Sequence, residues 1–265
     1  MILSTEISVP SAPTERLDWR IALYDQCRAN PREWYRWAFD QIALRNDAHL
    51  MDLGCGTARF WHVNRDRIPV DWHVYLCDAS RAMANSVQHG LLPLPCSAAV
   101  IIGDTDSIPF PDRSLDAILA MHVLHLVPNL EKALRGLRRV LKKDGRLYAT
   151  AGTLMRLRNL DALGASCSPQ IKVLLRDPRE QFCTENGADT LLRHFREVQV
   201  REYKDTVRFE DLDTLVRYIR TTEGASAAAL EPPAFDTFGP FLQQLLQADG
   251  HITIRNDAAL FEATV

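Results

Sequence analysis

An acidic residue and two glycines stand together at residues 52–58, Asp-Leu-Gly-Cys-Gly-Thr-Ala, directly after an apolar stretch. Gly54 and Gly56 can adopt backbone angles that side chains forbid, and they let a ligand approach the main chain closely. The pattern D-x-G-x-G-x-A differs from the G-x-G-x-x-G turn that binds pyrophosphate at a helix N-terminus. Because a carboxylate repels phosphate, Asp52 favours a positively charged partner such as an amino group. The stretch predicts a ligand-binding turn and argues against a nicotinamide dehydrogenase.

A second carboxylate, Asp78, ends the next apolar run, one strand–helix–strand unit after Asp52. In nucleoside-binding α/β sheets, an acid at this strand end accepts hydrogen bonds from ribose hydroxyls. Asp78 is equally suited to cap the helix expected at residues 81–88. A carboxylate at a strand end can do both, so the two interpretations stay open at this point.

Two further groups follow predicted strands. Residues 103–106, Gly-Asp-Thr-Asp, have the composition of a turn. Met121 and His122 follow the fourth strand, and ligands in open α/β sheets bind at that edge. An imidazole titrates near neutral pH, so His122 is a candidate general base toward a substrate hydroxyl. The alternative is that His122 packs against a ligand or bonds a backbone carbonyl.

Strand and helix patterns alternate along the chain, and two strands near the end look antiparallel. This order predicts an α/β three-layer αβα sandwich with a mostly parallel sheet. A helix is expected at 130–141, ended by Gly145. The expected strands are 49–53, 72–78, 98–102, 114–120, 146–151 and 198–204, with a closing hairpin at 251–265.

The ordered motifs resemble those of class I S-adenosylmethionine-dependent methyltransferases of the small-molecule, ubiquinone or natural-product type. The resemblance covers about residues 14–265 and implies a Rossmann-like, seven-stranded sheet with an antiparallel last strand and a helical cap. The chain departs from the family pattern at Ala58 (usually Gly), at Met121 (usually Asn) and at residues 143–144 (usually Pro-Gly). The segments that carry the resemblance are 52–58, 78–83, 103–110, 116–126 and 138–147.

The resemblance implies S-adenosyl-L-methionine as cofactor and S-adenosyl-L-homocysteine as product. Asp78 would then bind the ribose, Met83 the adenine side, Asp104 the adenine amine, and the Thr105 backbone N–H the ring. An aromatic ring such as Tyr24 would cover the sulfonium, because aromatic faces attract cations; the alternative is that the N-terminal helices simply pack on the sheet. The implied cofactor-binding residues are Tyr24, Asp52, Gly54, Cys55, Gly56, Asp78, Ala79, Met83, Asp104, Thr105 and Met121.

The expected domain organisation has a flexible tail at residues 1–13, which contain two prolines. A single methyltransferase domain is expected over 14–265. Within it, residues 14–46 form an N-terminal helical cap, and residues 153–194 form a helical insertion on the substrate side.

Composition narrows the partners. The 265 residues carry a net charge of −3, with a pI of about 6.2 and no long run of Lys and Arg, so no nucleic-acid partner is expected. Six cysteines form no C-x-x-C pair, so no metal is expected. Residues 1–13 lack the features of a leader, and no apolar run is long enough to span a membrane; a cytoplasmic protein without a membrane partner is expected.

The sequence thus predicts in-line methyl transfer to a small-molecule acceptor with an oxygen, nitrogen or carbon nucleophile, in secondary metabolism. Two alternatives remain. One is a nucleic-acid or protein methyltransferase on the same fold, although no Asn-Pro-Pro-Tyr-like segment follows the fourth strand. The other is a protein that binds the cofactor without methyl transfer, for regulation or a cyclase-like reaction. The sequence does not indicate an oligomeric state.

Overall fold

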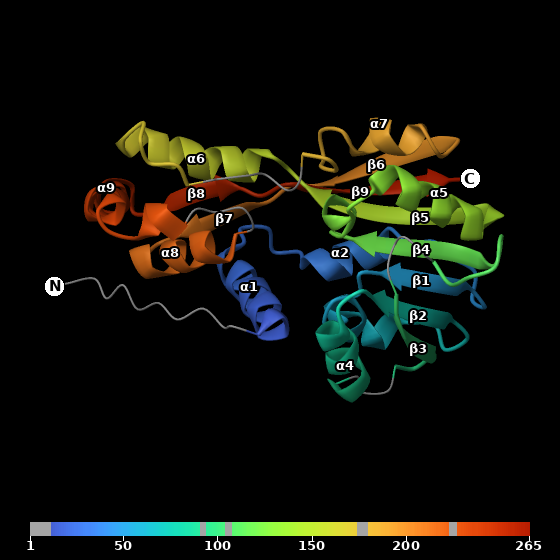
Figure 1. The fold of residues 1–265 in the computed structure, drawn as a ribbon. Helices are drawn as coiled ribbons and strands as arrows, with labels where there is room; N and C mark the ends of the chain where they lie inside the picture. The colour runs from blue at the N-terminus through green and yellow to red at the C-terminus, as the bar shows by residue number, and fades with distance from the viewer. Residues whose placement is uncertain (1–11, 91–93, 104–107, 174–179, 223–226) are drawn as a thin grey trace. The chain divides into compact units, whose positions relative to one another are not determined.

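The computed structural model describes residues 12–90, 94–103, 108–173, 180–222 and 227–265. The chain's contacts divide it into two compact units, each assembled from three chain segments (Figure 1). Each unit has a hydrophobic core of its own. Unit 1 comprises residues 1–31, 153–178 and 204–257, and unit 2 comprises residues 32–152, 179–203 and 258–265.

A seven-stranded sheet forms the centre of unit 2. The last strand of the chain runs antiparallel to both of its neighbours, and the first five strands run parallel to one another. The predicted mostly parallel sheet with an antiparallel last strand is therefore confirmed. In sheet order the strands are β3 (Ser97–Ile102), β2 (His73–Asp78), β1 (His49–Leu53), β4 (Leu115–Met121), β5 (Leu141–Gly152), β9 (Ala258–Thr264) and β6 (Glu197–Tyr203).

The chain order reverses at the centre of this sheet. From β1 the chain moves outward through β2 to β3, and it then returns to place β4 on the other side of β1. Asp52 is paired with Leu76 of β2 and with Leu119 of β4. Ligands of open α/β sheets bind outside the carboxyl ends of the strands at such a reversal. The glycine turn, Asp78 and Met121 all follow strands that end at this edge.

Helices cover both faces of the sheet in unit 2, which completes the predicted three-layer sandwich (Figure 1). The fifth helix is amphipathic and buries Ala133, Leu134 and Leu137, while Asn129 caps its first turn by accepting the Lys132 N–H at 2.9 Å. The helical elements are α2 (Trp34–Asp40), α3 (Arg59–Val63), η1 (Arg65–Arg67), α4 (Arg81–Gly90), η2 (Leu124–Leu126), α5 (Leu130–Val140) and α7 (Gly187–Leu192).

The predicted end of α5 is wrong. The helix stops at Val140, and β5 begins at once with Leu141, which pairs with Leu115 of β4. The ammonium of Lys142 lies 2.8 Å from both carboxylate oxygens of Asp116. The pairing with β4 then resumes between Ala117 and Arg146, so residues 142–145 form an irregular segment within β5, and Gly145 does not end the helix.

Unit 1 has a small two-stranded sheet with helices packed on it. The predicted closing hairpin is wrong, because β8 pairs with β7 in this unit whereas β9 joins the large sheet. The bend at Asn256 is held by the backbone N–H of Asn256, which donates to the carbonyl of Asp205 at 2.9 Å. The elements are α1 (Pro13–Cys27), α6 (Met155–Cys167), β7 (Thr206–Phe209), α8 (Leu212–Thr221), η3 (Ala227–Leu230), α9 (Ala234–Asp249) and β8 (Ile252–Arg255).

The two expected helical additions are each divided between the units. Residues 14–46 give α1 in unit 1 and α2 in unit 2, and residues 153–194 give α6 in unit 1 and α7 in unit 2. The single domain expected over 14–265 stays a prediction. The expected tail lies almost entirely outside the described residues. Among those that the structure describes, none of the helices has the length and apolar character needed to cross a membrane.

Candidate functional site

Three residues of the glycine turn adopt the left-handed backbone conformation. Their φ angles are 69° at Gly54, 55° at Gly56 and 57° at Ala58. A Cβ on Gly54 would lie 2.4 Å from a methyl carbon of Val123, so that position excludes any side chain. Ala58 takes the same strained conformation with a methyl group present. Its geometry gives a physical reason why glycine is the usual residue at this place in the motif.

The turn is anchored to the end of β2. The backbone N–H groups of Gly54 and Cys55 both donate to the carbonyl of Cys77, at 2.8 and 3.1 Å. The Gly56 N–H donates to Oδ2 of Asp78 at 2.9 Å. The backbone of the binding turn is therefore fixed by the strand that carries the second carboxylate.

Asp78 also shapes the turn that leads to α4. Its Oδ1 accepts the backbone N–H of Ser80 at 2.8 Å, whereas the helix itself is capped by Ser80, whose Oγ accepts the Met83 N–H at 3.4 Å. Each carboxylate oxygen has two acceptor positions, so both oxygens can accept a further hydroxyl donor. The ribose role of Asp78 stays a prediction that this geometry permits.

Asp52 is buried behind the turn, with 2% of its surface exposed. Its Oδ2 accepts the indole N–H of Trp61 at 2.7 Å, and its Oδ1 has no partner in the described part of the chain. Burial raises the pKa of Asp52 to about 7; the charge of Asp78 adds to the rise, and the Trp61 bond opposes it. A cationic group bonded to Oδ1 would restore the charged form. Nothing in the sequence spacing pointed to Trp61 as the partner.

Cys55, in the turn, and Cys77, in β2, are both buried, and the cofactor contact expected of Cys55 stays a prediction. Cys55 and Cys77 are 9% and 4% exposed. Burial raises the pKa of both thiols, that of Cys77 to about 12, so both are protonated at neutral pH. In the residues that the structure covers, no group of three or more His, Cys, Asp or Glu side chains is arranged to hold a metal ion.

His122 stands at the carboxyl end of β4 with a φ angle of 55°, unusual for a residue other than glycine. Its backbone N–H donates to Oγ1 of Thr150 at 2.9 Å, and Thr150 is also the register partner of Met121. Non-glycine residues in this conformation often lie at functional sites, where the surrounding structure enforces it. The base role of His122 stays a prediction.

An aromatic cluster adjoins His122. The ring of Trp34 lies 5.1 Å from the imidazole, measured between centroids, and it stacks on Trp37 at 5.1 Å. Tyr203 of β6 packs edge-on against Trp34 at 5.1 Å. Both indoles are buried, at 6% and 8% exposed. The helix that carries them, α2, therefore packs within unit 2.

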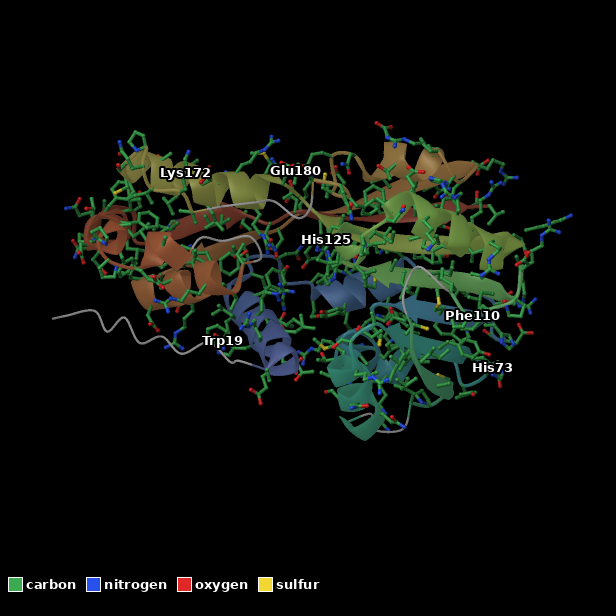
Figure 2. The ribbon with its side chains drawn as sticks, in the orientation of Figure 1. Trp19, His73, Phe110, His125, Lys172 and Glu180 are labelled. Atoms are coloured by element: carbon green, nitrogen blue, oxygen red, sulfur yellow. The ribbon has the colours of Figure 1, made fainter. Side chains whose placement is uncertain are left out.

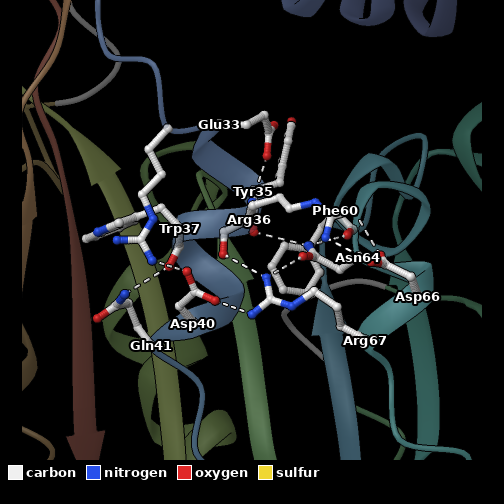
Figure 3. A network of polar contacts seen from close by, with 11 residues as sticks. Glu33, Tyr35, Arg36, Trp37, Asp40, Gln41, Phe60, Asn64, Asp66 and Arg67 are labelled. Atoms are coloured by element: carbon white, nitrogen blue, oxygen red, sulfur yellow. Dashed lines mark hydrogen bonds and ion pairs between the residues drawn. The ribbon is translucent and has the colours of Figure 1, made fainter.

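A polar network clamps α2 onto α3 and η1 (Figure 3). Arg36 donates to both oxygens of Asp66 at 3.0 Å, and Arg67 pairs with Asp40. The buried amide of Asn64 donates to the carbonyl of Tyr35 at 3.1 Å. The network holds α2 in place, and with it the indole that faces His122.

The other predicted site residues are less closely tied to the turn. Ala79 is exposed just before α4, and Met83 is half-buried in its first turn. Tyr24 belongs to unit 1, where its hydroxyl donates to Asp205. His125 follows on η2 (Figure 2), and its carbonyl accepts the side-chain amide of Gln181 at 3.1 Å. Asp104 and Thr105 lie outside the described residues.

Comparison with known proteins finds similarity to a methyltransferase family over the part of the chain that contains the glycine turn. The family described as "Methyltransferase domain" matches residues 51–149, from the strand before the glycine turn to the middle of β5. A ubiquinone/menaquinone biosynthesis C-methyltransferase, UbiE of Pseudomonas savastanoi pv. phaseolicola, is 30% identical over 157 residues. That match covers 57% of this chain and 61% of the relative, so the chain spans about three fifths of the curated protein.

Solved structures share the fold at low sequence identity. YcgJ of Bacillus subtilis aligns with a TM-score of 0.56 and 16% identity, over 87% of this chain and 97% of its own. A SAM-dependent methyltransferase of Aquifex aeolicus aligns with a TM-score of 0.52 and 16% identity, over 72% and 91%. These likenesses concern the arrangement of the elements alone.

Proposed function

Because residues 51–149 match the family described as "Methyltransferase domain", we propose that this chain is a class I S-adenosylmethionine-dependent methyltransferase that transfers the methyl group to a small-molecule acceptor. S-adenosylhomocysteine is the second product. One observation carries the proposal. The turn at residues 54–58 has a left-handed backbone, it is hydrogen-bonded to Asp78, and it lies where the strand order of the sheet reverses.

The residues of this turn fit that cofactor. The buried Oδ1 of Asp52 has no partner among the described residues, and it suits the ammonium of an amino-acid end. Asp78 offers acceptor positions to a pair of ribose hydroxyls. The missing side chain at Gly54 gives Val123 room to pack against the turn and permits its left-handed backbone. A pyrophosphate would meet two carboxylates here, which argues for a cofactor without phosphate.

The bound cofactor supplies a methyl group attached to a sulfonium. When the methyl group is transferred, the sulfur becomes a neutral thioether, which is the leaving group. The chain's own task is to orient an acceptor in line with that bond and to exclude water. Orientation of this kind can lower a barrier by as much as about 7–11 kcal/mol. For a hydroxyl acceptor, His122 would take the proton at a ring nitrogen as the new bond forms. A free amine or a carbanion needs no strong base, and His122 would then only shape the pocket.

Two observations support a small-molecule acceptor. The net charge is −3 without a long basic run, so the electrostatic footprint for a nucleic-acid backbone is missing from the sequence. The curated relatives are named as carbon methyltransferases of ubiquinone and menaquinone biosynthesis, which favours a compact, largely apolar acceptor. A cytoplasmic location and a place in secondary metabolism stay predictions.

Calorimetric titration with S-adenosylhomocysteine tests the cofactor site. We expect the wild type to bind and Asp78→Asn to lose about 1–3 kcal/mol of binding free energy, the usual range for a hydrogen bond to a charged acceptor. Asn retains one acceptor oxygen, so it perturbs the turn less than Ala does. Asp144→Asn, which alters an exposed carboxylate of β5, is the control and should bind as the wild type does. Absence of wild-type binding, or equal binding by Asp78→Asn, would refute the proposal.

Transfer of labelled methyl groups separates the three functional alternatives. The enzyme is incubated with cofactor labelled at the methyl carbon and, in separate reactions, with quinone-type phenols, transfer RNA or a protein extract. We expect label in the phenol arm. Label in either macromolecular arm would favour a macromolecular acceptor, and binding without transfer in any arm would favour a regulatory or cyclase-like role.

A further inference from the structure

Arg156 is a charged residue that the described part of unit 1 encloses without a counter-charge. It stands in the first turn of α6 and points toward α8, where its Nη1 lies 3.5 Å from the hydroxyl of Tyr218. The guanidinium carbon is 5.9 Å from the centroid of the Tyr218 ring. Tyr218 is only 2% exposed and packs on Phe209. The side chain of Arg156 is therefore held against the core of this unit.

Two of the three guanidinium nitrogens lack an acceptor among the described residues. Nε and Nη2 of Arg156 are both shielded from solvent, and neither has a hydrogen-bond partner within the ranges that the structure describes. The hydroxyl of Tyr218 does not supply a negative charge, because burial raises the pKa of that phenol. Leaving a buried charge unpaired is expensive, and natural proteins pair such groups or bind something to them.

The geometry of the two nitrogens indicates what is bound. Nε–H and one Nη2–H point in the same direction from one edge of the planar guanidinium, and this edge matches the two oxygens of a carboxylate or a phosphate. Elsewhere in the chain Arg36 makes a two-point contact with Asp66 through its other edge, Nη1 and Nη2, at 3.0 Å for each bond. At Arg156 the third nitrogen, Nη1, is held by Tyr218, and this contact fixes the orientation of the Nε and Nη2 edge. The described residues offer that edge no acceptor.

The nearby charge also favours an anion. Arg20 on α1 is close enough to Tyr218 to act on its pKa in the same direction as Arg156 does. Cys27, also near Tyr218, has a thiol pKa that burial raises, and it is therefore neutral. Arg156 and Arg20 therefore act on the Tyr218 phenol in the same direction.

We propose that unit 1 binds a small metabolite through a carboxylate or phosphate group, which accepts two hydrogen bonds from Nε and Nη2 of Arg156 while Tyr218 orients Nη1. The side chains that shield the edge must move aside for the anion to enter. Once bound, the anion lies in a dry environment, where charge-assisted hydrogen bonds are strongest. The inference rests on the geometry of Arg156 and does not depend on the methyl-transfer proposal.

Thermal unfolding of the full chain in graded inorganic phosphate or acetate, against chloride at equal ionic strength, tests the site. We expect one or both anions to raise the unfolding midpoint of the wild type above the chloride series. Arg156→Met should lose this shift, with the apparent Kd raised at least about tenfold. Arg156→Lys should keep only part of it, because an ammonium lacks the two-point edge. Arg158→Met removes an exposed arginine of the same helix and should respond as the wild type does.

Each outcome decides the matter. A response to phosphate alone identifies a phosphate-bearing ligand, and a response to acetate identifies a carboxylate. The proposal is overturned if neither anion shifts the wild type, or if Arg156→Met responds as strongly as the wild type. If Arg156→Met does not fold, NMR of the arginine Nε–H groups provides a second test. The signal that is present in the wild type and missing from Arg156→Lys belongs to Arg156. We expect this signal to shift when phosphate or acetate is added, and a signal that does not shift would overturn the proposal.

Discussion

Trp61 donates its indole N–H to one oxygen of Asp52 at 2.7 Å and so leaves the other oxygen as a buried acceptor behind the glycine turn. The bond fixes the rotation of the carboxylate, and burial keeps its pKa at about 7. The same residue is therefore a poor anion in the free protein and a strong acceptor for a cationic ligand.

The pH dependence of folding should report this carboxylate. Its pKa is about 7 in the folded chain against 3.8 in the ordinary state, so the folded protein retains a proton that the unfolded chain releases over this interval. The stabilising effect of that proton is complete below the lower pKa and is lost as pH rises through the upper one. Asp52→Asn has no titrating carboxylate at this position, so it does not lose this stability as pH rises. We expect the variant to gain on the order of a few kcal/mol relative to the wild type between pH 5 and pH 8.

Urea unfolding at pH 5, 6, 7 and 8 measures the difference, because the other titrating groups are common to both proteins. Asn keeps an acceptor oxygen for the Trp61 indole, so the substitution removes the charge and preserves the bond. Asp144→Asn serves as the control and should follow the wild type. Parallel curves for wild type and Asp52→Asn would mean that the carboxylate is already ionised in the fold.

The turn itself can be tested at Gly54. Gly54→Ala forces a methyl group to within 2.4 Å of Val123 and into a backbone conformation with a φ angle of 69°. The backbone penalty is about 1–2 kcal/mol, and overpacking adds about 1–3 kcal/mol. Gly250 has a φ angle of 73°, and no described atom lies within 4 Å of the place that a Cβ would take, so Gly250→Ala carries the backbone penalty alone. Chemical denaturation should show the larger loss at Gly54, and Val123→Ala in the same chain should recover part of it.

Much of the site could be predicted from the sequence, because its residues lie at the ends of strands that the sequence also predicts. The parallel order of β1, β2 and β4 brings the glycine turn, Asp78 and Met121 to one edge, and local patterns suffice to predict those strands. Trp61 and Thr150 were missed because each bonds a site residue 9 or 28 positions away along the chain, and the spacing of residue types does not reveal such a contact. Ala58 was seen as a departure, but its strained backbone is a property of the folded turn alone.

The division into two units could not be predicted for a similar reason. Unit 1 joins three distant segments, and its small sheet pairs residues 206–209 with 252–255. Local alternation near the C-terminus looks like a hairpin, since β8 and β9 are separated by only a short bend. The partner of each strand is decided by long-range pairing, which a pattern of period two does not specify.

Strain at His122 predicts an unusual ranking of substitutions. The residue has a φ angle of 55°, which glycine adopts freely and alanine does not. We expect His122→Gly to be more stable than His122→Ala by about 1–2 kcal/mol in chemical denaturation. In most strand positions glycine is the less stable of the two, so the reverse order would show that the backbone relaxes when the imidazole is removed. Thr150→Val, which strands the His122 N–H, should lose about 1–3 kcal/mol.

Tyr24 offers the last test, because its observed bond to Asp205 can be separated from the sulfonium contact predicted for its ring. Its hydroxyl donates to Oδ2 of Asp205, a carboxylate only 5% exposed whose Oδ1 accepts the Asn30 and Thr206 N–H groups at 2.8 Å. Tyr24→Phe removes that donor and should destabilise unit 1 by about 1–3 kcal/mol. Amide exchange should become faster in α1 and β7 and remain unchanged in the large sheet. If the ring also covers the sulfonium, Tyr24→Phe keeps wild-type affinity for S-adenosylmethionine and Tyr24→Ala loses it; equal affinity in all three proteins would show that Tyr24 serves only to hold Asp205.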